Sequence, residues 1–424
     1  MTAARGTPSW SSSVAAPAWT SDLVIAARNL ARTPRRSLLS LAAIAGGVVA
    51  LILAGGFIEW NLWYGRESTI HSQLGHIRVF RAGYLQSGFA DPYRYLLPET
   101  SQELAAIEAE PGVLVVAPRL SFSGLASFGD ATLSFLGEGL DPAKEAQLSR
   151  AVEIVAGVDL ARSDADGVVV GEGLAANLGV KPGDRVVLVA NTASGGVNAA
   201  EVTVRGLFAT ITKAYDDSAI RLPLALARRL TRTSGAHSWA IVLTDTDLTP
   251  TVLERVKAAL PADRYEVVPW TRLADFYNKV AALYERQFGL VQWIIGAVIL
   301  LGITNTMLMS VVERTSEIGT ALAIGRRRSA ILRSFLLEGA LIGIAGGVAG
   351  LAIGLILAAL ISAIGIPMPP SPGMARGFVA GIRVTPGLAV QACTVALLAA
   401  LAAGVYPAWR ASRMNIVDAL RTGR

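Results

Sequence analysis

Residues 339–360 read GALIGIAGGVAGLAIGLILAAL, a run without a single charged side chain. A helix rises about 1.5 Å per residue, so a run of about 20 residues spans the roughly 30 Å hydrocarbon core of a bilayer. Three further uncharged runs of similar length lie at residues 38–58, 288–312 and 384–409. The sequence therefore predicts four transmembrane helices. Buried core helices of a soluble protein are the less favoured interpretation, because four such runs in one chain are rare.

The composition agrees with a membrane protein. Of the 424 residues, 52% are hydrophobic and only 17% are charged, and the mean hydropathy is +0.48. Soluble domains carry about 25% charged residues, and disordered chains have low hydrophobicity. The single cysteine, Cys393, excludes an internal disulfide and a cysteine-based zinc site. With three histidines in the chain, we predict no metal site.

The net charge of +6 is interpreted as a topology signal. Three short segments, residues 1–37, 313–333 and 410–424, together hold 14 arginines and 4 acidic residues. Short cytoplasmic segments collect Lys and Arg, and a chain that crosses four times places all three on one side. We therefore expect both termini to be cytoplasmic, the first span to be a retained anchor, and nucleic acid not to be a partner.

The long segment between the first two spans is predicted to fold as an outside α/β domain. Strand-like runs lie at residues 76–80, 113–117, 167–170, 185–190, 201–207, 239–243 and 265–268, and helical runs at 100–110, 222–230, 251–260 and 271–284. Residues 181–184, KPGD, predict a turn before a strand. Residues 191–198 are rich in Gly, Ser and Asn and predict a hairpin loop.

No catalytic or nucleotide-binding motif is found in the chain. The segment VVVGEG at residues 168–173 resembles a nucleotide-binding turn, but Ala176 stands where the third glycine is required. No phosphate-binding loop of the G-x-x-x-x-G-K-[ST] type and no G-x-S-x-G nucleophile elbow occurs. A metal site at His71 and His76 would need further ligands nearby, and no cysteine is available, so polar strand-edge histidines are the favoured interpretation.

The inner end of the second span carries the most informative segment, ERTSEIGTALAIGRRR at residues 313–328. Glu313 and Glu317 are four residues apart and therefore share one helix face. Gly319 and Gly325 are predicted to permit a tight reversal into the third span. A short amphipathic helix that docks a soluble partner and a solvated loop that only sets the topology fit this spacing equally well.

The third span carries two rows of glycines spaced four residues apart, which predict close helix packing. The rows are Gly339, Gly343 and Gly347, and Gly346, Gly350 and Gly354. Whether the neighbouring helix belongs to the same chain is left open. Asn305 and Glu338 are polar groups near membrane depth; we expect a structural hydrogen bond for Asn305, and water or Arg333 as the partner of Glu338.

Four segments together resemble one known family, the permease subunits of MacB/FtsX/LolC-type ABC transporters. They are AARNLARTPRR at 26–36, GEGLAANLGVKPGD at 171–184, the run 305–339 with ERTSEIG, and YPAWRASR at 406–413 followed by DALR at 418–421. Two positions depart from the family pattern: Leu322 stands where a basic residue is frequent, and Ile416 where proline often occurs. The strand at residues 75–84 is closer to the lipoprotein-release (LolC/LolE-like) branch.

The resemblance implies an α-helical membrane protein with four transmembrane helices and a large extracytoplasmic α/β domain, like the MacB periplasmic core, between the first and second helices. The expected segments are a disordered N-terminus (1–20), a cytoplasmic amphipathic helix (21–37), the first span (38–64), the outside domain (65–285), the second span (286–312), a coupling segment (313–334), the third span (335–365), a short, polyproline-like outer loop (366–383), the fourth span (384–409) and a cytoplasmic tail (410–424).

The resemblance also implies a function without catalysis in this chain. The protein would be a permease of the bacterial inner membrane that transmits ATP-driven motion of a separate ABC ATPase, present in two copies, to the outside domain. The cargo would be lipophilic or lipid-anchored, such as a lipoprotein. Residues Glu313, Arg314, Glu317, Gly319 and Gly325 would form the ATPase-coupling interface.

Other partners implied are a second permease, same or related, membrane lipids and a periplasmic protein; ATP and Mg²⁺ would be bound by the ATPase, and no cofactor by this chain. One alternative is an FtsX-like regulator that uses the same motion to control an external hydrolase without transporting cargo. A membrane enzyme is a second alternative, but no set of residues supports it.

Overall fold

The computed structural model describes residues 26, 28, 32, 34–88, 90–370, 374 and 376–415. The segments predicted to be a disordered N-terminus (1–20) and, for the most part, an amphipathic helix (21–37) lie outside the described residues, as do the tail motif DALR and Ile416. The chain divides into two compact units. We call residues 1–60, 284–366 and 380–424 the membrane unit, and residues 61–283 and 367–379 the α/β unit.

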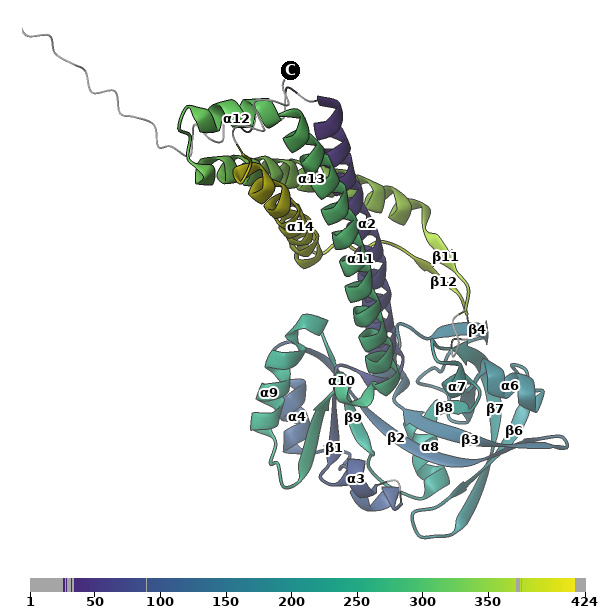
Figure 1. Ribbon diagram of the computed structural model, residues 1–424. Coiled ribbons are helices and arrows are strands. Elements are labelled where there is room, and N and C mark those ends of the chain that lie inside the picture. Colours follow the sequence, from purple (N-terminus) through teal and green to yellow (C-terminus); the bar gives the residue numbers. More distant parts are fainter. Residues whose placement is uncertain are drawn as a thin grey trace, which may run out of the picture. The chain divides into compact units, whose positions relative to one another are not determined.

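Four long helices are apolar enough to cross a membrane (Figure 1): α2 (Pro34–Thr69), α11 (Asp275–Glu313), α13 (Arg328–Ile364) and α14 (Pro386–Ser412). The predicted helix at residues 271–284 is not a separate element. Its first residues lie in the short α10 (Trp270–Leu273), and the rest belong to α11, a single helix of 39 residues that runs from Asp275 to Glu313. No proline interrupts this stretch, so the polar segment and the apolar span propagate as one helix.

The two glycine rows of α13 pack against different helices of the same chain. A Cβ built on Gly343 would lie 3.0 Å from the Cβ of Ala400 in α14, and Gly339 faces the same helix. A Cβ built on Gly350 would lie 2.7 Å from the carbonyl oxygen of Ala45 in α2. Gly346 and Gly354 also face α2, whereas a Cβ on Gly347 would meet no atom within 4 Å. Helix α13 therefore packs closely on both α2 and α14.

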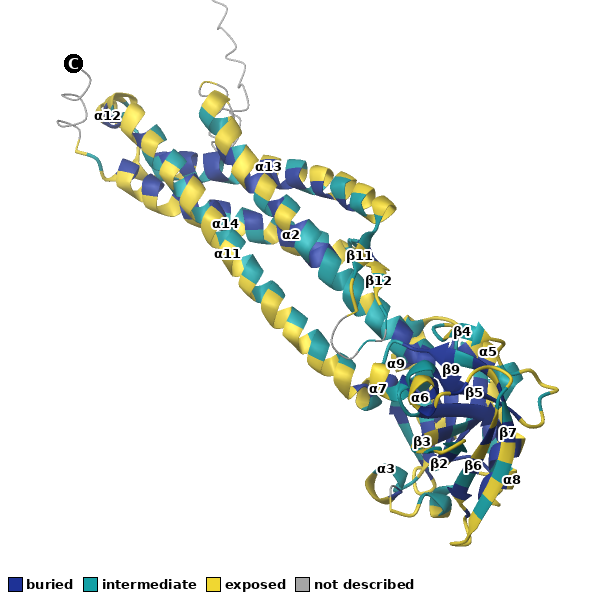
Figure 2. Ribbon diagram, turned by 90° about the vertical axis from the view of Figure 1, so that its right-hand side faces the viewer, coloured by how far each residue is buried: buried dark blue, intermediate teal, exposed yellow. Residues whose placement is uncertain are grey.

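The membrane unit has a continuous apolar core, and the outward faces of its helices are exposed. Figure 2 shows buried and exposed residues alternating along α11, α13 and α14. The core contains Ile44 and Leu51 from α2, Ile299 from α11 and Ala396 from α14. Of residues 366–373, predicted to be polyproline-like, the first three instead form β11 (Ile366–Met368), which pairs with β12 (Phe378–Ala380), and residues 371–373 lie outside the described residues.

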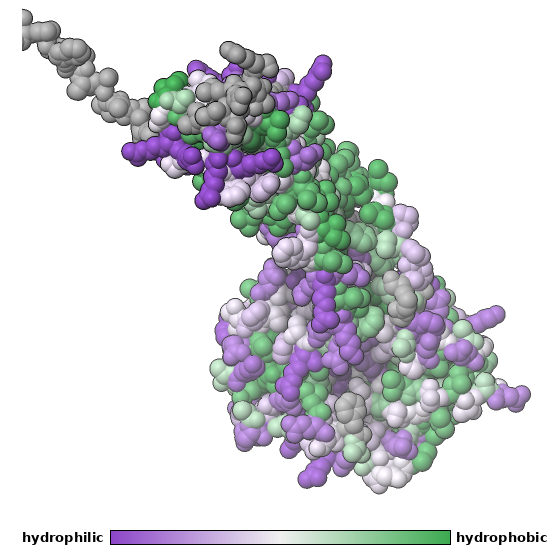
Figure 3. Space-filling model, viewed as in Figure 1, coloured by the Kyte–Doolittle hydropathy of each residue, from purple (hydrophilic) through white to green (hydrophobic). Residues whose placement is uncertain are grey.

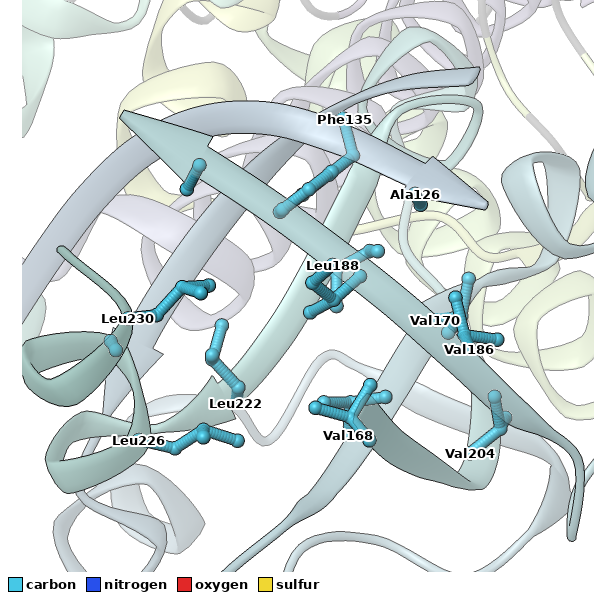
Figure 4. Close-up of a cluster of buried hydrophobic side chains, with 14 of the residues drawn as sticks. Ala126, Phe135, Val168, Val170, Val186, Leu188, Val204, Leu222, Leu226 and Leu230 are labelled. Atoms are coloured by element: carbon cyan, nitrogen blue, oxygen red, sulfur yellow. The ribbon is translucent and has the colours of Figure 1, made fainter. Parts of the chain in front are cut away.

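Six strands of the α/β unit close into a barrel. Their order is β2 (Val113–Phe128), β3 (Ala131–Leu140), β8 (Ala219–Pro223), β5 (Gly167–Gly171), β7 (Val197–Ala209) and β6 (Arg185–Asn191), and β6 pairs with β2 again. The pairs β3–β8 and β5–β7 are parallel and the others are antiparallel. Figure 4 shows the apolar interior, where Leu226 and Leu230 of α8 (Leu224–Thr231) meet Val168, Leu188 and Leu222 from the strands.

A second, antiparallel sheet shares strand β2 with the barrel. Its order is β10 (Tyr265–Pro269), β1 (Ile77–Arg81), β9 (Ser238–Leu243) and β2. Helices α4 (Gln102–Glu108) and α9 (Thr249–Ala259) pack together on it (Figure 1), and their buried residues Ile107 and Val252 join a core with Trp239. Strand β4 (Glu153–Gly157) pairs with β7.

The remaining helices of the α/β unit are short. They are the π-helix η1 (Ile70–Leu74), α3 (Tyr84–Ser87), η2 (Pro92–Tyr95), α5 (Pro142–Leu148), α6 (Glu172–Leu178), α7 (Lys213–Asp216) and η3 (Thr246–Leu248).

All seven predicted strands of this unit are present, but three strands were missed. The turn at residues 181–184 and the hairpin loop between β6 and β7 are confirmed. Strands β3, β4 and β8 were not predicted, because β3 and β4 carry glycines and charges that weaken the strand pattern. The helix predicted from residue 222 begins at Leu224, after strand β8 and Pro223.

Candidate coupling site at the inner ends of the membrane helices

The segment between α11 and α13 folds as the helix α12 (Thr315–Ala323), which ends at a glycine in the left-handed conformation. Gly325 has φ +94°, its N–H donates to the carbonyl of Leu322, and the N–H of Arg326 donates to the carbonyl of Ala321. These two bonds form the motif that commonly terminates helices at a glycine. Gly325 therefore permits the reversal that leads into α13 at Arg328.

The prediction that Gly319 also takes part in the reversal is wrong, because Gly319 lies inside α12. It is buried together with Ile318 and Leu322 on the face that packs on the membrane unit. Leu322, which the resemblance marked as a departure from the family pattern, is buried in the apolar core. A basic side chain here would have to be accommodated in an apolar core.

Ion pairs tie the predicted coupling residues to other helix ends of the membrane unit. Glu313 pairs with Arg36 of α2. Arg314 contacts Glu338 of α13 at 3.0 Å and Glu317 of α12 at 3.5 Å. Glu317 also lies 3.7 Å from Arg32. Glu313, Arg314 and Glu317 therefore all form ion pairs within this chain, and these ion pairs connect the α12 segment to the neighbouring helix ends.

The polar residues near membrane depth differ in their surroundings. Glu338 is buried and accepts a hydrogen bond from Arg314, a partner that the sequence did not suggest. Asn305 is exposed on α11 and makes no hydrogen bond within the described residues. The hydrogen bond that we expected for Asn305 is therefore not made among the described residues of this chain.

The exposed face of α12 is small and mostly uncharged. It presents Ser316, Glu317, Thr320 and Ala323, and it ends in Ile324, whose exposed fraction is 82%. Ile324 was missed at the sequence level. Its exposure could have been predicted from helix periodicity. Ile324 lies six residues after the buried Ile318, which places it about 240° around the helix, away from the buried face. Ile324 is therefore the one large apolar side chain on this otherwise small or polar exposed face, among the described residues.

At the other end of α2, the chain enters the α/β unit through the π-helix η1, whose carbonyls are held by buried arginines. Arg221 donates a hydrogen bond to the carbonyl of Ser72 at 2.5 Å, and Arg78 donates to the carbonyl of Gln73 at 2.8 Å. Arg221 lies on β8 of the barrel and Arg78 on β1 of the second sheet. The end of the helix is therefore attached to both halves of the α/β unit.

The two arginines belong to a buried charge cluster that we define as Arg78, Arg119, Arg221, Glu138 and Glu145. Arg119 is completely buried on β2; it donates to Glu138 at 2.9 Å and also pairs with Glu145. Burial alone would raise the pKa of Glu138, but the guanidinium groups of the three arginines outweigh it and lower this pKa to about 2. Both carboxylates have arginine partners, so the cluster holds the two halves of the unit together by charge pairing.

The histidines near η1 serve a structural role. His76 is buried; its Nδ1 accepts a hydrogen bond from the backbone N–H of Leu243, and its Nε2 lies 3.0 Å from the hydroxyl of Thr246. Burial lowers the pKa of His76 to about 4, and the nearby His71 and Arg66 add to the effect. His76 is therefore a neutral, hydrogen-bonded residue between β9 and η3 at neutral pH.

In the turn that resembled a nucleotide-binding motif, other residues of the chain pack directly against both glycines. A Cβ on Gly171 would overlap the carbonyl of Asp216, and a Cβ on Gly173 would overlap the side chain of Asp217. Both aspartates lie at the end of α7. The glycines therefore permit the close approach of α7 to the start of α6, which gives them a packing role.

Comparison with protein families gives two matches that together cover most of the chain. Residues 37–259 match the MacB-like periplasmic core domain, and residues 289–416 match the C-terminal part of FtsX-like permeases. The first match alone covers more than half of the 424 residues.

Two relatives show different extents of similarity. The chain is 33% identical over 174 residues to the macrolide export ATP-binding/permease protein MacB of Rhodopirellula baltica, which covers 40% of this chain and 23% of that protein. It is 24% identical over 415 residues to an uncharacterized ABC transporter permease of Methanocaldococcus jannaschii, covering 94% of this chain and 97% of the relative. The chain therefore spans less than a quarter of the MacB protein that it matches.

Two solved structures are similar to part of the chain. The periplasmic region of MacB from Actinobacillus actinomycetemcomitans covers 48% of this chain and 94% of that structure, with 14% identity and a TM-score of 0.35. The extracellular domain of the noncanonic ABC-type transporter YknZ from Gram-positive bacteria covers 46% of this chain and 100% of that structure, also with 14% identity and a TM-score of 0.35.

Proposed function

Because this chain belongs to the MacB/FtsX-type family of ABC transporter permeases, we propose that it transmits ATP-driven motion from a separate ATPase to its extracytoplasmic domain. The cargo that we propose is lipophilic or lipid-anchored, such as a lipoprotein. The membrane would be the bacterial inner membrane, with both termini in the cytoplasm. The arginine-rich segments at the inner helix ends support this orientation.

The observation that carries the proposal is the construction of α12. Its exposed face is free to dock a soluble partner, and its buried face and ion pairs connect it to α2, α11 and α13. A displacement of α12 would therefore move three helix ends together, because packed helices respond as rigid elements. Glu317 supports this role as a link between α12 and Arg314, and Ile324 supports it as a contact for the ATPase.

The length of the first two membrane helices supports the transmission of this motion. Helix α2 has 36 residues and α11 has 39, whereas about 20 residues are enough to span the hydrocarbon core. Each helix continues without interruption from the inner segment to the residues that enter the α/β unit. The attachment of η1 to both halves of that unit would then pass an axial displacement of α2 to the barrel and the second sheet alike.

We propose that the ATPase is a separate subunit, present in two copies, which binds the ATP and Mg²⁺. The relative from Methanocaldococcus jannaschii supports this assignment, because it is named a permease and the match covers 97% of its length. We also propose a second permease as a partner. Asn305 supports it, because its exposed amide has no partner among the described residues, and such a group at membrane depth is costly and would gain a hydrogen bond from a neighbouring helix.

The docking role is tested by exchanging one exposed isoleucine of the membrane unit. We expect I324S to reduce co-purification of the ATPase at least tenfold, and to lower transport-coupled ATP hydrolysis in proteoliposomes to the same degree. The matched control is I364S, because Ile364 is equally exposed, at 85%, but lies at the opposite end of α13. Full co-purification with I324S would exclude α12 as the docking surface.

The second permease is tested by cross-linking in a C393S background. We expect N305C to form a disulfide-linked dimer in the native membrane, because two copies of α11 would bring these positions together. T394C, exposed on α14, serves as the control and should remain monomeric. If only a related permease is the partner, N305C will cross-link in its presence alone. The absence of any cross-link would reject α11 as the contact.

A further inference from the structure

A second candidate site lies between the start of α13 and the end of α14. A pocket of about 480 Å³ is lined by Arg328, Ser329 and Leu332 of α13, by Trp409 and Ser412 of α14, and by Arg413, which follows the last residue of α14. The pocket is shallow and open to its surroundings, so a ligand would lie along the surface of the two helices. The pocket differs from the coupling site, because none of its lining residues belongs to α12 or to its ion pairs.

The two guanidinium groups of the pocket have no carboxylate partner among the described residues. This distinguishes Arg328 and Arg413 from Arg36 and Arg314, which pair with glutamates of the same unit. The guanidinium of Arg413 lies over the ring of Trp409, with its central carbon 5.2 Å from the ring centroid. This contact orients the guanidinium and leaves its donors directed to solvent.

Further donors in the pocket are free in the described part of the chain. The hydroxyl of Ser329 makes no hydrogen bond with any described residue. Arg328 and Ser329 are the first two residues of α13, and the first N–H groups of a helix have no partner within it. None of the described residues that line the pocket is acidic. Its chemistry is therefore that of an anion site, with a preference for phosphate, which arginine binds through two parallel hydrogen bonds.

An exposed apolar surface leads into this basic pocket. Leu398, Val405 and Tyr406 lie along the outward face of α14 and are exposed, and Trp409 follows them before Arg413. Figure 3 shows the corresponding change in the membrane unit, where hydrophilic residues gather at the α12 end and hydrophobic residues cover the adjoining length of the helices. Trp and Tyr at this position are typical of the headgroup level of a bilayer. A partner protein with an acidic surface could bind the two arginines without contacting these exposed apolar residues, so the apolar residues favour a lipid.

We propose that this pocket binds the headgroup phosphate of an anionic phospholipid, with the acyl chains along the apolar face of α14. Arg328 and Arg413 hold the phosphate from the two helices, and Ser329 donates a further hydrogen bond. Basic pockets between membrane helices are known to select anionic headgroups in this way. The bound lipid bridges the start of α13 to the end of α14. The proposal does not depend on the ATPase or on the cargo.

The test uses the purified full chain in detergent and measures retained lipid by native mass spectrometry after addition of phosphatidylglycerol or phosphatidylcholine. We expect the unmodified chain to retain phosphatidylglycerol at least tenfold more strongly than phosphatidylcholine. The double variant R328Q/R413Q should lose this preference. The control R185Q/R272Q removes the same charge from exposed positions of the α/β unit and should keep it.

Two further arms separate the sources of the anion. Inorganic phosphate at millimolar concentration should not displace the lipid, because it has no apolar tail; complete displacement would mean that the site binds free phosphate and would overturn the lipid assignment. A conservative variant, R328K/R413K, should bind phosphatidylglycerol several-fold more weakly than the unmodified chain, since lysine cannot make the two parallel bonds. If R328Q/R413Q folds and keeps its preference for phosphatidylglycerol but no longer co-purifies with the ATPase, the pocket contacts a protein and the proposal fails.

Discussion

Both units of this chain have apolar cores, but different residues fix how their parts meet. The α/β unit encloses a cluster of charges, with Arg119 completely buried between two glutamates. The membrane unit encloses glycines, and Gly350 brings α13 into contact with the backbone of α2 at Ala45. In the α/β unit, long hydrogen-bonded side chains join neighbouring elements. In the membrane unit, glycines allow two helices to approach closely.

The difference follows from the solvent of each unit. In water, burial of apolar surface drives folding, so a few paired charges can be tolerated and can fix how two halves of a domain meet. In lipid, apolar surface gains nothing by leaving the solvent, and helices associate through close van der Waals contact. We therefore expect the loss of a buried charge to reduce the stability of the α/β unit, and the gain of a methyl group to reduce the stability of the membrane unit.

The largest effect is expected from the buried charge cluster. R119M leaves Glu138 and Glu145 without their shared partner, and removal of one partner of a buried ion pair costs about 3–5 kcal/mol of unfolding free energy. The measurement is proteolytic resistance and thermal unfolding of the full chain. R185M is the matched control, because Arg185 is exposed and lies 3.6 Å from Glu201. A loss below about 1 kcal/mol for R119M would contradict a central role of the cluster.

The next effect concerns pH. His76 has a folded-state pKa of about 4 against an ordinary value of 6.5, so the neutral form stabilises the fold. This stabilisation is fully present above pH 6.5 and is lost as the pH falls towards 4. The lowered pKa corresponds to a loss of at most about 3 kcal/mol of unfolding free energy when His76 becomes protonated.

The variant that tests the pH effect is H76Q, which can make hydrogen bonds but does not titrate. We expect its melting temperature to fall less than that of the unmodified chain between pH 7 and pH 4.5. Identical pH profiles of the two proteins would show that protonation of His76 does not contribute to acid sensitivity.

A smaller effect is expected in the membrane unit, where a pair of substitutions isolates the close contact. G350A places a methyl group against the Ala45 carbonyl and the side chain of Val48, and overpacking costs about 1–3 kcal/mol. G347A makes the same change in the same helix, but its Cβ meets no atom within 4 Å. We expect a lower melting temperature in detergent for G350A alone. Equal behaviour of the two variants would mean that α2 and α13 do not depend on close approach.

The smallest effect is expected at a glycine that has no packing role. Gly325 has φ +94° and open space around it, so G325A meets only the backbone cost of the left-handed conformation, about 1 kcal/mol. Thermal unfolding should register this small loss, while binding of phosphatidylglycerol remains unchanged. A larger loss would indicate that the turn after α12 also contributes tertiary contacts.

The candidate site could be predicted in part. The spacing of Glu313 and Glu317 and the turn at Gly325 were visible in the sequence, because helix periodicity and glycine conformation are local properties. The partners of these residues were not visible. Arg36 and Glu338 reach the site from α2 and α13, far away in the sequence, and Ile324 is exposed only because α12 turns its other face to the core.

Alone, the sequence determined the four spans, the α/β character of the long insertion and seven of its strands, since hydrophobic length and alternation act over neighbouring residues. The tertiary structure decided which contacts these elements make. It assigned one glycine row of α13 to α14 and the other to α2, closed six strands into a barrel through β6, and gathered Arg78, Arg119 and Arg221 around two glutamates. Such contacts depend on packing between distant segments, which no local pattern encodes.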